Sequence, residues 1–138
     1  MMPQGSEADR SGIISTLHAY QAALNAADTN AVLPLYEPDG VFMQPHGPSA
    51  IGTDAIRQTY DADFRTFRLQ VTFQVAEVQL LSPEWAFVRT NSAGTNTVLA
   101  TGAQSAEANQ ELFILHKGVS GSWKIARYSF STTNPPHA

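Results

Sequence analysis

The chain has 138 residues and a mass of 14.9 kDa, which is enough for one domain with a single hydrophobic core. Hydrophobic residues make up 43% of the sequence and charged residues 14%, a balance that excludes an intrinsically disordered chain. The net charge of −4 and the scattered Lys and Arg residues argue against a nucleic-acid partner, and the absence of cysteine excludes disulfides, thiolate nucleophiles and cysteine-ligated metals.

The sequence predicts a protein that is neither exported nor inserted in a membrane. Its first residues, MMPQGSEADR, lack the basic and then apolar pattern of a secretory signal. No apolar run approaches the ~18 residues that are needed to span a bilayer. We therefore expect a soluble, cytoplasmic protein.

The N-terminal part is predicted to form one long and one short helix. Apolar residues recur with helical spacing over residues 7–26. Asp28 can cap a second helix that runs through Tyr36, which Pro34 should kink or shorten because proline lacks an amide donor. The sequence Pro-Asp-Gly at 38–40 is expected to end this helix.

A short strand and a third helix are predicted next. The stretch LYEPDGVFMQP places the strand at 41–45, and the following HGPSAIGT is typical of a loop. Thr53 or Asp54 should cap the third helix, which is expected to end near Arg68. Its apolar face comprises Ile56, Tyr60, Phe64 and Phe67.

From residue 69 the hydrophobic period changes from helical to alternating, which indicates β-strands. Strands are predicted from 69 to the turn at 82–84, then over 85–98, 109–117 and 123–131, with a loose loop at 100–108. The fold class is therefore α+β: a curved, cone-shaped antiparallel sheet wrapped around three N-terminal helices. We expect one domain over 1–138 with its core at about 7–131.

The predicted strand 109–117 carries apolar residues on both faces, with Leu112 and Ile114 on one and Phe113 and Leu115 on the other. One face should pack on the first helix. The apolar residues of the other face must also be buried, and a homodimer, in which a second copy of the chain packs on this face of the sheet, is the simplest explanation.

Several stretches of the chain resemble one protein superfamily. The order of AYQAALNAADTNAVLPLYEPDGVFMQP, AIGTDAIRQTY and WKIARYSF resembles the nuclear transport factor 2-like superfamily, which has a cystatin-like fold. GVFMQP, SAGT, ANQELFILHK and WKIARY are most similar to the SgcJ/EcaC type of SnoaL-like proteins, and the resemblance covers about 7–131. It implies a homodimer with a deep pocket between helices and sheet. The superfamily includes ketosteroid isomerases, limonene epoxide hydrolases, dehydratases, polyketide cyclases and noncatalytic domains, so the fold leaves the function open.

The resemblance to ketosteroid isomerases can be carried over at three positions. Tyr20 falls where those enzymes place an oxyanion-binding tyrosine, and Glu111 falls close to their second acidic residue. Gln44 falls where they place the aspartate base, and a carboxamide cannot accept a proton as a carboxylate does. The isomerase reaction is therefore not implied in its usual form.

Glu111 shares a strand face with Phe113, so it is expected to point into an apolar pocket. A buried charge needs a partner, for which Arg127 is the first choice and Arg89 the second. Such a pair could bind a small polar or anionic ligand, Glu111 could act as a base, or the pair could be purely structural.

Other polar residues have two interpretations each. Gln44 could orient a ligand or bond to the backbone, and Tyr20 and Tyr60 could offer hydroxyl groups to the pocket or belong to the core. His46 lies in a loop that should border the pocket, or it is simply exposed. The predicted apolar walls are Phe42, Phe64, Trp85, Phe113 and Phe130.

These patterns predict a small-molecule-binding protein that uses no metal or cofactor. No histidine pair has metal-site spacing, and no GxGxxG or P-loop motif occurs in a suitable context. The first hypothesis is an acid–base enzyme of the isomerase, cyclase or hydrolase type, with Glu111 and Tyr20 as catalytic groups. The alternatives are a noncatalytic ligand-binding or assembly domain, and a purely structural dimer.

Overall fold

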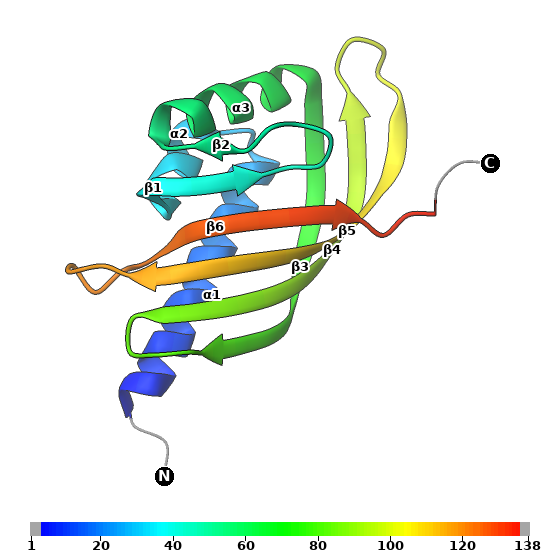
Figure 1. Cartoon of the computed structure of the whole chain (residues 1–138). Helices are drawn as coiled ribbons and strands as arrows, with labels where there is room; N and C mark the ends of the chain where they lie inside the picture. The colour runs from blue at the N-terminus through cyan, green and yellow to red at the C-terminus, as the bar shows by residue number, and fades with distance from the viewer. Residues whose placement is uncertain (1–3, 136–138) are drawn as a thin grey trace.

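The computed structural model describes residues 4–135, in which a curved sheet covers a long helix and two shorter ones (Figure 1). The helices are α1 (Gln4–Asn25), α2 (Thr29–Val32) and α3 (Thr53–Thr66), with a 3₁₀ turn, η1, at Leu33–Leu35. The strands are β1 (Tyr36–Met43), β2 (Ala50–Ile51), β3 (Phe67–Leu80), β4 (Trp85–Val98), β5 (Gln104–Lys117) and β6 (Trp123–Thr132). The predicted α+β class is confirmed.

The sheet has the strand order β2-β1-β6-β5-β4-β3. Strands β3 to β6 form the predicted antiparallel meander. β1 joins this meander by pairing in parallel with β6, and the short β2 extends it beyond β1. Figure 1 shows α1 crossing one face of the long strands, with α3 near β1 and β2. The concave space between these helices and the sheet holds the core and the candidate site.

The segment after α1 differs from the prediction in its second half. The Asp28 side chain caps α2 as predicted, accepting a hydrogen bond of 3.1 Å from the Ala31 amide. The α-helix ends at Val32, however, and tightens into the 3₁₀ turn that contains Pro34. Because β1 already starts at Tyr36, the helix ends before the Pro-Asp-Gly sequence, and the strand is longer than predicted.

Three other boundaries were wrong. Helix α3 is preceded by Gly52 as its N-cap, without a side-chain cap from Thr53 or Asp54. Helix α3 ends at Thr66 with Phe67 as its C-cap, two residues before the predicted end near Arg68, and β3 starts at Phe67 instead of residue 69. β5 starts at Gln104 because residues 104–108, predicted as a loop, pair with the end of β4. These residues are small or polar and lack the alternation that would have identified a strand.

The buried faces of the helices agree with the helical spacing in the sequence. The core side chains of α1 are Ile13, Leu17, Tyr20 and Leu24, and those of α3 are Ile56, Tyr60 and Phe64. Among the described residues, no helix is both long and apolar enough to cross a bilayer.

Two side-chain amides of α1 form hydrogen bonds with the backbone of β3, the strand at one edge of the sheet. The Asn25 side chain donates to the Val71 carbonyl and accepts from the Val71 amide, at 2.9 Å in both cases. The Gln21 side chain accepts from the Phe73 amide at 2.8 Å. These contacts satisfy groups that an edge strand otherwise exposes, and they fix α1 against the sheet.

Candidate functional site

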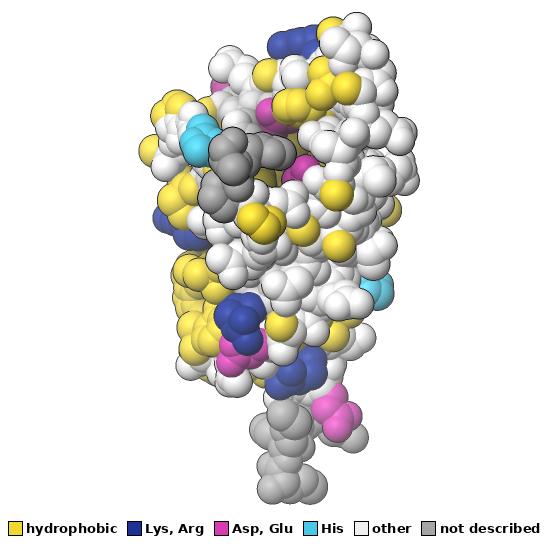
Figure 2. All heavy atoms as spheres, turned by 90° about the vertical axis from the view of Figure 1, so that its right-hand side faces the viewer, with side chains coloured by type: hydrophobic (Ala, Val, Ile, Leu, Met, Phe, Trp, Pro, Cys, Tyr) yellow, Lys and Arg dark blue, Asp and Glu magenta, His cyan; other side chains and the backbone are white. Residues whose placement is uncertain are grey.

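A cavity of about 160 Å³ lies between α1, α3 and the concave face of the sheet. Every long element contributes to its lining, which is mainly apolar and aromatic. The lining residues are Tyr20, Leu24, Phe42, Gln44, Tyr60, Asp63, Phe64, Phe67, Leu69, Val71, Phe73, Ser92, Asn96, Glu107, Asn109, Glu111, Tyr128 and Phe130. Figure 2 shows a hollow in the upper half of one face, with acidic and hydrophobic side chains around it.

The cavity brings together many of the residues that the sequence singled out. Those that line it are Tyr20, Gln44, Tyr60, Glu111, Phe42, Phe64 and Phe130. Phe113 is fully buried next to it, stacked on Tyr128 with ring centroids 4.1 Å apart.

Three buried tyrosine hydroxyls form a chain that reaches the cavity. The Tyr60 hydroxyl lies 2.6 Å from the Tyr20 hydroxyl and 2.8 Å from that of Tyr36. Three hydroxyl groups have three protons and two bonds use two of them, so one proton remains for donation out of the chain. Tyr20 and Tyr60 line the cavity, whereas Tyr36 does not. A chain in which Tyr36 donates to Tyr60 and Tyr60 to Tyr20 therefore leaves the Tyr20 proton for a ligand.

Burial raises the pKa of these tyrosine hydroxyls, and of Tyr128 beside them, well above the ordinary value. They are therefore protonated at neutral pH. Each can act as a hydrogen-bond donor, but none is a nucleophile or base in its resting state.

Glu111 is only 5% exposed and is held by two hydroxyl groups of β4. Thr90 donates to one carboxylate oxygen at 2.5 Å and Ser92 to the other at 2.6 Å. Burial raises the pKa of Glu111, the two hydrogen bonds oppose this effect, and the nearby charge of Glu107 adds to it. The result is a well-positioned carboxyl group with an increased affinity for a proton.

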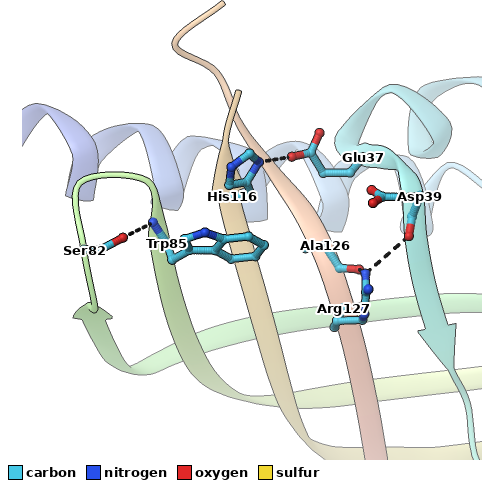
Figure 3. Close-up of polar contacts among 7 residues, drawn as sticks. All are labelled: Glu37, Asp39, Ser82, Trp85, His116, Ala126 and Arg127. Atoms are coloured by element: carbon cyan, nitrogen blue, oxygen red, sulfur yellow. Dashed lines mark hydrogen bonds and ion pairs between the residues drawn. The ribbon is translucent and has the colours of Figure 1, made fainter. Parts of the chain in front are cut away.

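The predicted pairing of Glu111 with Arg127 is wrong. On β6, Ile125 lies opposite Leu115 and Arg127 opposite Ile114, so that Ala126 is the extra residue of a β-bulge. The bulge reverses the alternation and turns Arg127 to the outer face, where it donates to the Asp39 and Ala126 carbonyls (Figure 3).

Arg89 also lies on the outer face of the sheet. Thr90, which bonds to Glu111, is buried on the concave face, so its neighbour Arg89 points away from the cavity. Arg89 instead pairs with Glu77 at 2.6 Å. The structure therefore provides hydroxyl groups, not an arginine, for Glu111.

Two further predicted site residues lie outside the cavity. Trp85 is 42% exposed on the outer face, where its ring lies 4.4 Å from that of His116, which contacts Glu37 (Figure 3). His46 is exposed in the loop after β1 and does not line the cavity. Trp85 is therefore not one of the apolar walls.

Several polar lining residues were missed in the sequence. Asp63 follows Tyr60 by one helical turn, and burial raises its pKa to about 6. Within residues 4–135, no hydrogen-bond donor reaches its carboxylate. Glu107 accepts a hydrogen bond of 2.9 Å from Asn109. The side-chain oxygen of Asn96 is buried and has no hydrogen-bond partner among the described residues. The spacing of Asp63 from Tyr60 and Phe64 was the available signal.

The cavity lining is acidic. It includes Asp63, Glu107 and Glu111, but no Lys, Arg or His from the part of the chain that the structure describes. This part also contains no group of three or more His, Asp or Glu side chains arranged to hold a metal ion. The lining is thus unfavourable for an anionic ligand, which the expected arginine would have favoured.

Comparisons with known proteins agree with this architecture. Residues 17–127 match the family model described as a SnoaL-like domain. A ketosteroid isomerase-like protein from Erwinia carotovora atroseptica is 41% identical, with 91% of this chain and 96% of that chain covered and a TM-score of 0.87. None of the curated proteins matches the chain.

More distant solved structures share the fold. A nuclear transport factor 2-like superfamily protein from Salmonella enterica is 16% identical, with 96% of each chain covered and a TM-score of 0.82. A domain of unknown function with a cystatin-like fold from Nostoc punctiforme is also 16% identical, covers 93% of this chain and 79% of its own, and has a TM-score of 0.75.

Proposed function

Because the chain belongs to the SnoaL-like domain family, we propose that its cavity binds a small, largely apolar molecule with a carbonyl oxygen and catalyses proton transfer on it without a metal or cofactor. The observation that carries this proposal is the tyrosine chain that ends at Tyr20. Its donor is buried, oriented by Tyr60 and protonated at neutral pH. Such a preorganised donor stabilises the negative charge that develops on a carbonyl oxygen during acid–base catalysis.

The size of the cavity limits the part of the substrate that it can enclose. An apolar cavity of about 150 Å³ holds a benzene-sized molecule, so a volume of about 160 Å³ fits one ring. The aromatic side chains of Phe42, Phe73 and Phe130 supply apolar contacts for such a ring.

Glu111 is the second group of the proposed mechanism, as acid or base. Its pKa is raised, and its charge lies close enough to Tyr20 to affect the pKa of that hydroxyl. The two groups can therefore act on the same bound molecule. Reactions of the isomerase, cyclase or hydrolase type all need such a pair.

One observation favours a noncatalytic alternative. Gln44 lies at the cavity, and its amide does not titrate near neutral pH, so it cannot serve as a general acid or base. In a protein that only binds its ligand, an amide at this position is sufficient to orient the ligand, and no base is required. In that case removal of the Tyr20 hydroxyl would weaken binding, and no turnover would occur in any variant.

The outer face of the sheet supports a proposed homodimer. Trp85 and Leu112 are 42% and 44% exposed there, with Phe87 and Ile114 partly buried beside them. The charge of Arg89 is balanced by Glu77 on the same face. An apolar surface on which Arg89 is already paired can pack on its own copy about a twofold axis with little like-charge repulsion from that residue.

The catalytic proposal can be tested with 3-cyclohexenone, an uncharged one-ring ketone that isomerises to the conjugated 2-cyclohexenone. We expect the protein to accelerate this conversion, which is measured by the ultraviolet absorbance of the conjugated ketone. Tyr20→Phe should lower the rate about 10²-fold, which is the effect of removing one oxyanion donor. Glu111→Gln should lower it by a similar factor.

The matched control is Glu84→Gln, in the exposed turn between β3 and β4, which should keep the wild-type rate. Circular dichroism and thermal unfolding check that each variant is folded. If Tyr20→Phe converts the ketone as fast as the wild type, the proposed function is wrong. Ketone binding without conversion in the wild type would favour the noncatalytic alternative.

A further inference from the structure

The acid–base chemistry proposed above needs a proton acceptor, and the strand position expected to supply one carries Gln44. Glu111 is a poor acceptor in one respect, since both of its oxygens already receive hydrogen bonds from Thr90 and Ser92. Asp63 differs from both: it has a carboxyl group, unlike Gln44, and within residues 4–135 its oxygens accept no hydrogen bonds, unlike those of Glu111. It also lines the same cavity.

The position of Asp63 on α3 suits this role. It lies three residues after Tyr60 and next to Phe64, and all three line the cavity, so α3 presents this side of its last turns to the ligand. The negative charge of Asp63 also raises the pKa of Tyr20, which means that the carboxylate and the hydroxyl are close enough to interact. A ligand between them would contact a donor and an acceptor.

We infer that Asp63 is the proton acceptor of the cavity and that the substrate carries no negative charge. This inference rests on the proposed function, because it assigns the base for that reaction. The second part follows from the lining: Asp63, Glu107 and Glu111 would repel an anion, and no described lining residue carries a compensating positive charge.

The proton transfer can be written for the probe ketone. The Asp63 carboxylate removes a proton from the carbon between the carbonyl group and the C=C bond, and the electron pair of that C–H bond forms the dienolate. The charge on its oxygen is stabilised by the Tyr20 hydroxyl, and Glu111 keeps the acid role of the two proposed for it above. Protonated Asp63 then returns the proton to the far carbon of the dienolate, which gives the conjugated ketone and regenerates the carboxylate.

The environment of Asp63 matches the demands of this step. Burial raises its pKa from 3.8 to about 6, so at neutral pH it is mostly ionised and yet a stronger base than an exposed aspartate. The absence of fixed partners among the described residues means that no hydrogen bond must break before the proton moves.

Kinetics with Asp63→Asn test the assignment. The wild-type kcat/KM for 3-cyclohexenone, which reports the ligand-free protein, should rise with pH through a midpoint near 6 and then level off, because the ionised carboxylate is the active form. Asp63→Asn should lower kcat at least about 10²-fold and abolish this pH dependence, while KM changes little. Asp61→Asn, on the same helix but outside the cavity lining, is the matched control and should keep the wild-type profile.

A second measurement does not depend on turnover. The carboxyl carbon of Asp63, observed by NMR, should titrate near pH 6, and saturation with cyclohexanone should move that midpoint. At neutral pH, 3-oxocyclohexanecarboxylate should bind at least about tenfold more weakly than cyclohexanone, and Asp63→Asn should reduce this difference.

The outcomes separate the inference from the proposed function. If Asp63→Asn keeps the wild-type kcat while Tyr20→Phe loses it, Asp63 is not the base and the proposed function remains. If cyclohexanone binding leaves the titration of Asp63 unchanged, or the carboxylate analogue binds as tightly as the ketone, the inference is wrong. If the wild type neither binds nor converts the ketones, both proposals are overturned.

Discussion

Two carboxyl groups face the same cavity with raised pKa values, but their surroundings differ. Glu111 is fixed by Thr90 and Ser92, so its position is set before any ligand arrives. Asp63 has no such partner among the described residues, and burial raises its pKa. Pairs of carboxyl groups in unequal environments are a common way to obtain different acid–base roles within one site.

The raised pKa of Asp63 has a consequence for stability. The folded-state pKa of about 6 exceeds the value of 3.8 for the free side chain, so between these pH values the folded state binds more protons than the unfolded state. The free energy of unfolding therefore falls as pH rises through this window. Because solvent screens this partly buried side chain, the loss stays below the ~3 kcal/mol that ~1.4 kcal/mol per pKa unit would give.

We expect Asp63→Asn to remove this pH-dependent cost, because the amide is uncharged. Compared with the wild type, the variant should gain stability in chemical denaturation at pH 7.5 relative to pH 4. The comparison between the two pH values cancels any packing change that the amide introduces. An equal difference at both values would contradict the raised pKa.

At the scale of secondary structure, strand alternation predicted the site only where it was uninterrupted. It holds along β5, so Glu111 and Phe113 were correctly placed on the concave face. It fails at the bulge in β6, where one extra residue turned Arg127 to the other face. Nothing in the local sequence marks that bulge, since Ala126 is compatible with a regular strand. The sequence did not identify Asp63, because whether a helical residue faces a cavity depends on which other elements pack against the helix.

Gly94 in β4 allows a close approach of β3 that shapes the cavity wall. A Cβ atom at this position would lie 1.8 Å from the Gln70 carbonyl oxygen, a backbone atom of β3 that cannot move without opening the strand pair. Gly94→Ala should therefore destabilise the protein by about 1–3 kcal/mol, the usual cost of overpacking.

Denaturant unfolding measures this effect. The control is Gly118→Ala in the turn between β5 and β6, where a Cβ atom would meet nothing within 4 Å, so stability should stay close to that of the wild type. Equal stability of Gly94→Ala and the wild type would mean that β3 and β4 are not packed so closely.

For the whole molecule, the sheet separates two surfaces of different composition. Its concave face holds the acidic cavity, and its outer face carries the arginines and the exposed apolar side chains that sequence reasoning had partly assigned to the cavity. The proposed dimer would use only the outer face. A second, shallower hollow contains Arg89 and Leu112 of the outer face, and among its lining residues only Glu111 and Phe130 also line the cavity. Each protomer's cavity would therefore remain accessible in the proposed dimer.

The dimer proposal predicts that a charge at the centre of the outer face separates the protomers. Leu112 is 44% exposed in the isolated chain, so Leu112→Glu should leave the fold intact, but in a dimer two buried carboxylates would face each other across the axis. Light scattering coupled to size-exclusion chromatography should give twice the chain mass for the wild type and the monomer mass for Leu112→Glu. Leu81→Glu is the matched control, because Leu81 is 63% exposed at the turn after β3 and lies away from the centre of this face. A monomeric wild type, or a Leu112→Glu variant that still dimerises, would show that the outer face is not the contact between copies, and the exposed Trp85 and Leu112 would then need another partner.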